Sequence, residues 1–201
     1  MPERLRVRAY YDFASTLCYV AHRVLGDMRP ELESLGVELV WAPLDLADLL
    51  GWRRGLPVAP ERLANAERVA AEHGVRVEPL RVWPDSRDAN AAALVLAREG
   101  REPAFRERVF SAAFEERREL DAPGAVAAFG RDLGVSLDAD RLERARDELA
   151  FRTQVAAAED VTGVPTLMLD EFPFGGIQSR ETTRLVLARW ASRKLAGALH
   201  G

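Results

Sequence analysis

The chain has 201 residues, with 28 Lys and Arg against 32 Asp and Glu, which gives a formal net charge of −4 at pH 7. This acidic balance argues against a nucleic-acid-binding protein, because binding to the phosphate backbone calls for a basic surface. Hydrophobic residues make up 48% of the chain and charged residues 30%, which is typical of a globular protein with a sizeable core. The length favours one large domain, or one domain with an insertion, over two independent domains.

The chain has a single cysteine, Cys18, and three histidines. One cysteine cannot form an internal disulfide, and these four residues cannot supply the ligand spacing of a zinc site, so any metal would need carboxylate ligands. The first residues lack the apolar segment of a signal peptide, and no stretch reaches the roughly 18 apolar residues of a membrane span. We therefore expect a cytoplasmic protein in which Cys18 is a free thiol.

The first part of the chain, residues 1–43, predicts a β-α-β unit. Residues 5–11 alternate apolar and polar side chains, the pattern of a half-buried strand. From residue 15 onward apolar side chains recur every three or four positions, which predicts a helix that is disturbed at Pro30. Residues 37–41 predict a second strand, and a right-handed crossover would make the two strands parallel.

The middle of the chain, residues 44–160, predicts an all-helical insertion. It is rich in Ala, Arg, Glu and Leu and has few β-branched runs. Residues 139–158 carry helical periodicity, supported by the i,i+4 pair of Asp140 and Arg144. The charges of residues 101–119 alternate in sign, which favours a solvated helical face over an anion-binding site.

The last part, residues 161–201, predicts a β-hairpin followed by a closing helix. Residues 165–169 and 174–177 have the pattern of two strands, joined by a turn at residues 170–173. Ser179 is a candidate N-cap for the helix that follows. The predicted order is therefore β-α-β, a helical block, and β-β-α.

Ser15 stands where the first predicted strand passes into the first predicted helix. The unpaired N–H groups and the positive dipole end of a helix N-terminus stabilise an anion there, including a thiolate. The alternative is that Ser15 is only a helix cap, which is a common role for serine. A hydrolase nucleophile is not indicated, because neither a Gly-x-Ser-x-Gly elbow nor an adjacent base accompanies it.

Three further positions bear on thiol chemistry. Cys18 lies one helical turn after Ser15, where a lone cysteine is typically a small buried hydrophobic residue. His22 could lower the pKa of the Cys18 thiol, although a surface histidine is the more common finding. Pro165 begins a predicted strand, where its missing backbone N–H donor costs least, and a cis bond there would leave the Val164 N–H and C=O free for an extended substrate.

The chain has four tryptophans, Trp41, Trp52, Trp83 and Trp190. We expect them to pack in the core or in the insertion and not to contact a substrate.

Three segments of the chain resemble a known family. Residues 12–21 read DFASTLCYVA and resemble the segment Asp-Phe-x-Cys-Pro-Trp-Cys-Tyr-Val-Gly of the FrnE-like, cytoplasmic branch of the DsbA family. Residues 161–166, VTGVPT, resemble its cis-proline segment, and residues 176–178, GIQ, resemble the Gly-Ala-Gln that precedes its last helix. The resemblance implies an α/β thioredoxin fold with an inserted all-helical domain. Residues 1–43 and 161–201 would form the thioredoxin halves, and residues 44–160 the insertion.

The chain departs from this family at the two cysteines. The attacking cysteine falls on Ser15 and the resolving cysteine on Cys18, so a dithiol cycle within this chain is impossible. The protein also resembles 2-hydroxychromene-2-carboxylate isomerases and kappa-class glutathione transferases, which carry serine at the position of Ser15. In them the hydroxyl donates a hydrogen bond to the sulfur of glutathione and holds it as a thiolate. Where Pro-Tyr or Pro-Trp usually follows, this chain has Thr16-Leu17, and its GIQ segment is closer to the oxidoreductase branch.

The resemblance implies a thiol-dependent oxidoreductase of the DsbA family with an atypical Ser-x-x-Cys motif. It would act with an external thiol, either as a monothiol oxidoreductase through Cys18 or as a glutathione-type transferase or isomerase. Neither a covalently bound cofactor nor a metal is expected, and glutathione or another low-molecular-weight thiol would be the cosubstrate. Ser15 and Cys18 are the predicted catalytic residues. The residues expected to bind a thiol or peptide substrate are Thr16, Val164, Pro165 and Gln178.

Two other interpretations stay open. The chain can be a non-catalytic thioredoxin-fold protein that holds a peptide or ligand in the same cleft. It can also be a Cys-x-x-Cys enzyme into which Ser15 was introduced, although Thr16-Leu17 in place of Pro-Trp argues against this. The expected partner is a small thiol or a cysteine-containing polypeptide, with a homodimer as an open alternative and with neither nucleic acid nor membrane.

Overall fold

A computed structural model describes residues 4–198 of the chain. The strands in this range are β1 (Leu5–Tyr11), β2 (Val37–Pro43), β3 (Thr166–Leu169) and β4 (Phe172–Gly175). The helices are α1 (Thr16–Asp27), α2 (Arg29–Ser34), α3 (Leu46–Leu50), α4 (Pro60–Glu72), α5 (Arg87–Arg98), α6 (Glu102–Phe114), α7 (Ala125–Asp132), α8 (Ala139–Ala158) and α9 (Arg180–Ala198). None of these helices is both long enough and apolar enough to cross a membrane.

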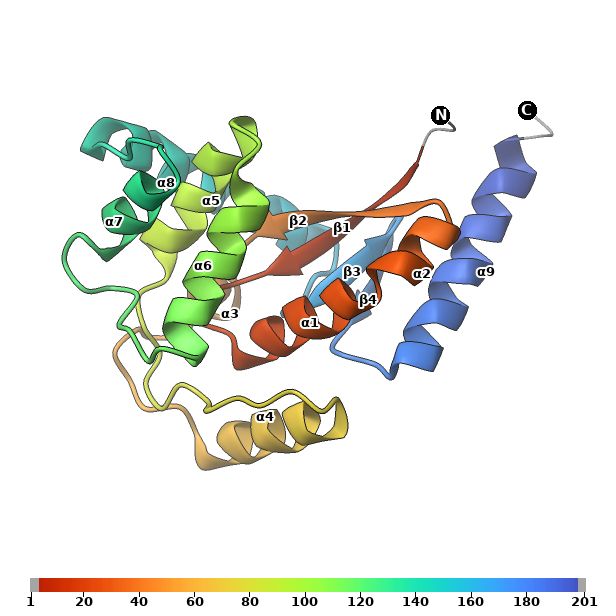
Figure 1. Cartoon of the computed structure of the whole chain (residues 1–201), viewed down its shortest axis with the longest axis horizontal. Helices are drawn as coiled ribbons and strands as arrows, with labels where there is room; N and C mark the ends of the chain where they lie inside the picture. The colour runs from red at the N-terminus through yellow and green to blue at the C-terminus, as the bar shows by residue number, and fades with distance from the viewer. Residues whose placement is uncertain (1–3, 199–201) are drawn as a thin grey trace.

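The four strands form one mixed sheet with the order β2-β1-β3-β4. β1 runs parallel to β2 and antiparallel to β3, and β3 pairs antiparallel with β4. Six helices, α3 to α8, lie between β2 and β3 in the sequence. In Figure 1, α5 to α8 gather at one end of the sheet, α9 lies at the other end, and α4 stands apart beside α1. The predicted β-α-β unit, with its parallel strands, is therefore present, and so is the closing β-β-α unit.

The element boundaries differ from the predictions at the β-hairpin. The predicted turn covers residues 170–173, but β4 already begins at Phe172, and Leu169 pairs with Phe172. Asp170 adopts a positive φ of 59°, a conformation that aspartate tolerates better than most residues and that helps the chain to reverse within two residues. At the closing helix the prediction is confirmed, since the Thr182 N–H donates to Ser179 Oγ at 3.1 Å.

One large hydrophobic cluster includes most of the buried residues of the insertion helices, a second lies on the sheet, and the two meet at β2. Phe110 of α6 is fully buried in the first cluster, and its ring lies 4.9 Å from that of Phe13 and 5.2 Å from that of His22, centroid to centroid. The second cluster lies between the sheet and α1, α2 and α9, where Trp190 is buried. Trp41 packs against both clusters. The packing roles predicted for Trp41 and Trp190 are thus confirmed.

Candidate functional site

Ser15 lies at the N-terminus of α1, directly after the loop that follows β1. Its backbone is extended (φ −94°, ψ 114°), and its Oγ accepts a hydrogen bond from the Cys18 N–H at 3.3 Å, so it is the N-cap of the helix. The first turn of α1 holds no acidic residue. The positive end of the helix dipole is therefore not neutralised within this turn, and a negative charge placed at Ser15 would be stabilised there.

Ser15 lines a pocket of about 580 Å³, which we call the site pocket. Its walls come from the start of α1, from the segment that precedes β3, and from the stretch between α3 and α5. The sequence predicted Ser15, Thr16 and Val164 as site residues, and all three line this pocket. Its charged lining residues are Glu61 and Arg62.

Two tryptophans that the sequence assigned to packing also line the site pocket. The rings of Trp52 and Trp83 lie 4.6 Å apart, centroid to centroid, and the Arg62 guanidinium lies 4.3 Å above the Trp52 ring. The two rings pack against each other within the insertion, as predicted, and they also form part of the pocket wall. Both belong to a stretch that extends away from the helical bundle, so their rings form a wall of the pocket instead of a core.

Val164 lines the site pocket, and its backbone polar groups are unpaired in the described structure. The Val164–Pro165 peptide bond is cis. On either side, the Pro165 carbonyl accepts from the Gly176 N–H at 2.8 Å, and the Gly163 carbonyl accepts from Thr166 Oγ1 at 2.7 Å. Within residues 4–198, no hydrogen bond engages the N–H or the carbonyl of Val164. These two groups can therefore pair with a bound extended chain.

Two predicted binding residues lie outside the pocket lining. Pro165 is buried next to β3, and Gln178 is exposed. Gln178 follows β4, the edge strand, which β3 separates from β1. The pocket is thus bounded on this side by the segment before Val164 and not by the segment after the hairpin.

Cys18 is fully buried, with an exposed fraction of 0%. It belongs to the cluster that packs against the insertion helices. Burial raises the pKa of the Cys18 thiol to about 12, against smaller opposing contributions from hydrogen bonds with Ser15 and the Asp12 backbone. The predicted catalytic role of Cys18 required a reachable thiol, and this position does not provide one.

His22 is directed towards α6 and not towards Cys18. Its Nε2 donates to Glu107 Oε2 at 2.8 Å, and its Nδ1 accepts from Arg106 Nη1 at 3.0 Å, an assignment that suits the neutral ring. Burial, followed by the charge of Arg106, lowers the pKa of His22 to about 4. The predicted surface position is therefore wrong, because α6 covers this face of α1.

This histidine should make the stability of the protein depend on pH. The unfolded chain takes up a proton at His22 near pH 6.5, whereas the folded chain does so only near pH 4. The contribution of the neutral ring is therefore complete above pH 6.5 and is lost as the pH falls towards 4, by up to about 3 kcal/mol. The measurement is the free energy of unfolding in urea at several pH values. In His22→Gln, this free energy should no longer show the decrease between pH 6.5 and 4 that is due to His22. His73→Gln, which changes the C-cap residue of α4, should retain this pH dependence. Equal slopes in the two variants would contradict the assignment of the pH dependence to His22.

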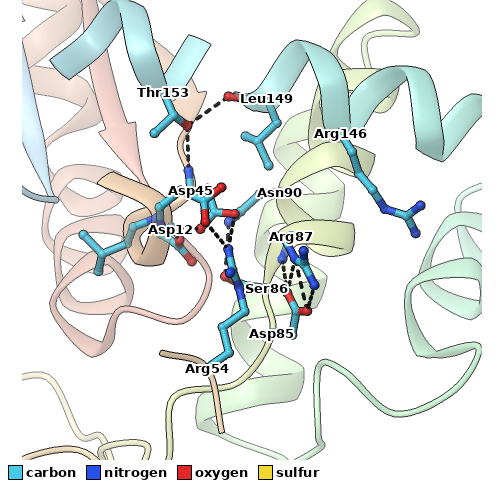
Figure 2. A network of polar contacts seen from close by, with 12 residues as sticks. Asp12, Asp45, Arg54, Asp85, Ser86, Arg87, Asn90, Arg146, Leu149 and Thr153 are labelled. Atoms are coloured by element: carbon cyan, nitrogen blue, oxygen red, sulfur yellow. Dashed lines mark hydrogen bonds and ion pairs between the residues drawn. The ribbon is translucent and has the colours of Figure 1, made fainter. Parts of the chain in front are cut away.

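A buried polar network holds the loops beneath Ser15. Asp12 has an exposed fraction of 0%, and its two oxygens accept from the Ala14 and Leu46 N–H groups, each at 2.7 Å. Asn90 accepts from the Phe13 N–H at 3.3 Å and donates to the Leu44 carbonyl at 2.9 Å. Burial raises the pKa of Asp12, and the hydrogen bonds that its carboxylate accepts, first those from the Leu46 and Ala14 N–H groups, oppose the rise. Figure 2 shows both residues between the sheet and α5.

This network is not among the features predicted from the sequence, although the sequence contains a signal for it. Asn90 is a polar residue inside the apolar run of residues 89–96, all of which are buried in α5. A buried amide in such a run needs hydrogen-bonding partners, which here are the backbones of two loops. In the part of the chain that the structure describes, no three His, Cys, Asp or Glu side chains are grouped so that they could hold a metal ion.

Comparisons with known proteins agree with this architecture. A family model for the DSBA-like thioredoxin domain matches residues 6–187. A solved structure of 2-hydroxychromene-2-carboxylate isomerase is 23% identical with a TM-score of 0.67, and the match covers 96% of each chain. A probable DsbA oxidoreductase from Streptomyces coelicolor is 20% identical with a TM-score of 0.70, over 92% of this chain and 89% of the other. The cytosolic disulfide reductase DsbM from Pseudomonas aeruginosa, described with GSH, is 19% identical with a TM-score of 0.62, over 98% and 100%.

No curated protein matches the chain. At these identities the solved structures bear on the fold alone. Together with the family model, they confirm the thioredoxin fold with a helical insertion that the sequence predicted.

Proposed function

Because the chain belongs to the DSBA-like thioredoxin domain family, we propose that it binds a low-molecular-weight thiol of the glutathione type and activates it at Ser15, as a transferase or an isomerase. One observation carries this proposal. Ser15 lies at a helix N-terminus in the site pocket, whereas Cys18, the sole cysteine of the chain, is buried with a pKa of about 12. The sulfur that reacts would therefore come from the ligand.

Ser15 and α1 would stabilise the ligand as a thiolate. Ser15 Oγ already accepts from the Cys18 N–H, which leaves the hydroxyl proton to be donated to the ligand's sulfur. The dipole of α1 acts in the same direction, since its first turn carries no acidic residue. The thiol proton passes to solvent, and the thiolate is the better nucleophile.

The peptide part of such a thiol has partners in the same pocket. The Val164 N–H and carbonyl can pair with its backbone. Arg62, on α4, is the cationic side chain of the lining and can pair with a ligand carboxylate. Asn65 also lines the pocket, and its Oδ1 accepts from Arg68 at 2.9 Å, which leaves its amide N–H groups available. Trp52 and Trp83 offer an apolar surface for a second substrate.

Two of the similar structures have descriptions that support the proposal. DsbM is described with GSH, and another is an isomerase. We propose the transferase or isomerase role in preference to a monothiol oxidoreductase, because the latter depends on Cys18. The description of DsbM as cytosolic also supports a cytoplasmic location for this chain.

The test is a titration of the protein with glutathione, followed by the ultraviolet absorbance of the thiolate. Wild type should bind and show the thiolate signal. Ser15→Ala should lose the signal and bind at least about tenfold more weakly, because a hydrogen bond to a charged sulfur is lost. Ser179→Ala is the matched control, since it removes the same kind of cap, worth about 1 kcal/mol, from α9.

The outcomes separate the two classes of function. A thiolate signal that persists in Ser15→Ala would remove Ser15 from the mechanism. A wild-type protein that ignores glutathione but binds an extended peptide would instead be a non-catalytic binding protein.

A further inference from the structure

Residues 51–85 form an arm that leaves the body of the protein after α3 and returns at α5, with α4 at its outer end. Residues 55–58 and 81–83 make the neck of this arm. Three backbone hydrogen bonds join its two segments. The Gly55 N–H donates to the Trp83 carbonyl at 2.7 Å, the Trp83 N–H to the Leu56 carbonyl at 3.0 Å, and the Val58 N–H to the Arg81 carbonyl at 2.8 Å. Figure 1 shows α4 separated from α5 to α8. The arm supplies most of the apolar wall of the site pocket.

Arg54 ties the base of the arm to the body. Its Nη2 donates to Asp45 Oδ2 at 2.5 Å and to Asp48 Oδ1 at 2.9 Å, and its Nε lies 3.2 Å from Asp85 Oδ1. The Arg54 side chain is 21% exposed and that of Asp45 is 3% exposed. In Figure 2 the guanidinium points from the arm towards Asp45. One cation thus holds three carboxylates, two from α3 and its N-cap and one from the returning end of the arm.

Asp45, the most buried partner of Arg54, is itself held in place by hydrogen bonds. Its side chain caps α3 by accepting from the Asp48 N–H at 3.2 Å, and its own N–H donates to Thr153 Oγ1 at 3.0 Å. Thr153 belongs to α8, and its hydroxyl donates to the Leu149 carbonyl at 2.9 Å. The position of Arg54 is therefore set by the helical bundle.

The Arg54–Asp85 pair lies next to the two tryptophans. The antiparallel bridge between Pro57 and Val82 sets a register in which Arg54 lies opposite Asp85. Trp52 precedes Arg54 by two residues, and Trp83 precedes Asp85 by two. The Arg54–Asp85 contact therefore lies between the two tryptophans along the arm, two residues from each of them.

We propose that Arg54 is a positioning residue that determines which apolar compounds the site pocket accepts, by holding Trp52 and Trp83 at their present spacing. This inference rests on the proposed function in one respect, namely that the apolar compound is the second substrate of the same reaction. Without Arg54, the buried Asp45 and the neighbouring Asp48 lose their shared cation and repel one another, and Asp85 keeps only Arg87. The neck, which includes Trp83, can then shift as a unit. Trp52 stays behind, because its N–H donates to the Ala47 carbonyl at 2.8 Å.

The experiment uses N-phenylnaphthylamine, an uncharged fluorescent apolar compound, as the probe. Arg54→Gln should raise its Kd by about tenfold, because a displaced aromatic wall loses its contact with the ligand. Arg54→Lys should give an intermediate Kd, since an ammonium keeps the charge but not the fork that reaches both sides of the arm. Arg87→Gln should leave the Kd unchanged, because Arg87 also binds Asp85 but does not contact α3.

A glutathione titration of the same variants separates the two proposals. Ser15 is held by the loops around Asp12, so Arg54→Gln should keep the thiolate absorbance at saturating glutathione. An unchanged Kd for the probe in folded Arg54→Gln, or a wild type that does not bind the probe, overturns the role of Arg54. A second variant, Asp85→Asn, serves if Arg54→Gln does not fold, because it leaves the Arg54–Asp45 pair intact. Asp85→Asn should also raise the Kd of the probe. An unchanged Kd in this variant overturns the proposed role of Arg54. Probe binding without a thiolate signal in wild type overturns only the proposed function.

Discussion

Cys18 should react with dithionitrobenzoate at least about a thousandfold more slowly in the folded protein than in the unfolded chain. Burial raises the pKa of this thiol from 9.0 to about 12, and three pKa units lower the fraction of thiolate about a thousandfold. The closed packing around the sulfur slows the reaction further, because the reagent has no access to it. The measurement is the rate of colour release at one pH, with and without guanidinium chloride.

A control moves the single thiol into the site pocket. The double variant Ser15→Cys with Cys18→Ala places a sulfur at the N-terminus of α1, where the helix dipole lowers the pKa of a thiol. This variant should react rapidly without denaturant. Rapid reaction of the folded wild-type protein would contradict the burial of Cys18 and would restore the monothiol mechanism.

Asp12→Ala should lower the free energy of unfolding by about 2–4 kcal/mol, because it leaves two buried backbone N–H groups without an acceptor. Those N–H groups belong to Ala14 and Leu46, which both line the site pocket. Asp12→Asn keeps one acceptor oxygen and should lose about half as much. Urea unfolding measures both variants.

Asp88 provides the matched control for this prediction. Its carboxylate also accepts two hydrogen bonds, from Arg146 at 2.6 and 2.9 Å, but both side chains are 44% exposed. Asp88→Ala should therefore cost only about 0–1 kcal/mol. An equal loss in the two variants would mean that the network around Asp12 does not hold the loops of the pocket.

The elements of this fold could be predicted where the signal is local. Alternation over residues 5–11 identified β1, and serines placed before apolar helical runs identified the caps at Ser15 and Ser179. These patterns depend on neighbours a few residues apart, so one sequence contains them. The thioredoxin fold followed from the resemblance. The order of the strands in the sheet was not predicted, because its pairings join distant segments.

The pocket wall could not be predicted in the same way. Trp52 and Trp83 meet only because the neck of the arm pairs residues far apart in the sequence, and each alone has the pattern of a core residue. Arg54 is one of 28 basic residues, and nothing in its neighbourhood marks it as the one that reaches three carboxylates. Long-range contacts of this kind leave no periodic trace in the sequence.

The burial of Cys18 was expected of a lone cysteine, but the spacing of apolar residues that predicted α1 does not include this position. The helix is buried on two sides. Ala21 and Leu25 pack with the sheet, whereas Cys18 and Tyr19 pack with the insertion helices. A helix held between two partners buries residues outside a single stripe, and only knowledge of both partners reveals which ones.

The position of β1 in the sheet constrains how a ribosome-bound chain can fold. β1 is an interior strand, but its antiparallel partner β3 is translated after all the helices of the insertion. Until then one edge of β1 stays open, and unpaired edges are prone to join other chains. The contact order of this sheet is therefore high, and sheet closure should be late and slow compared with the nearest-neighbour packing of α5 to α8.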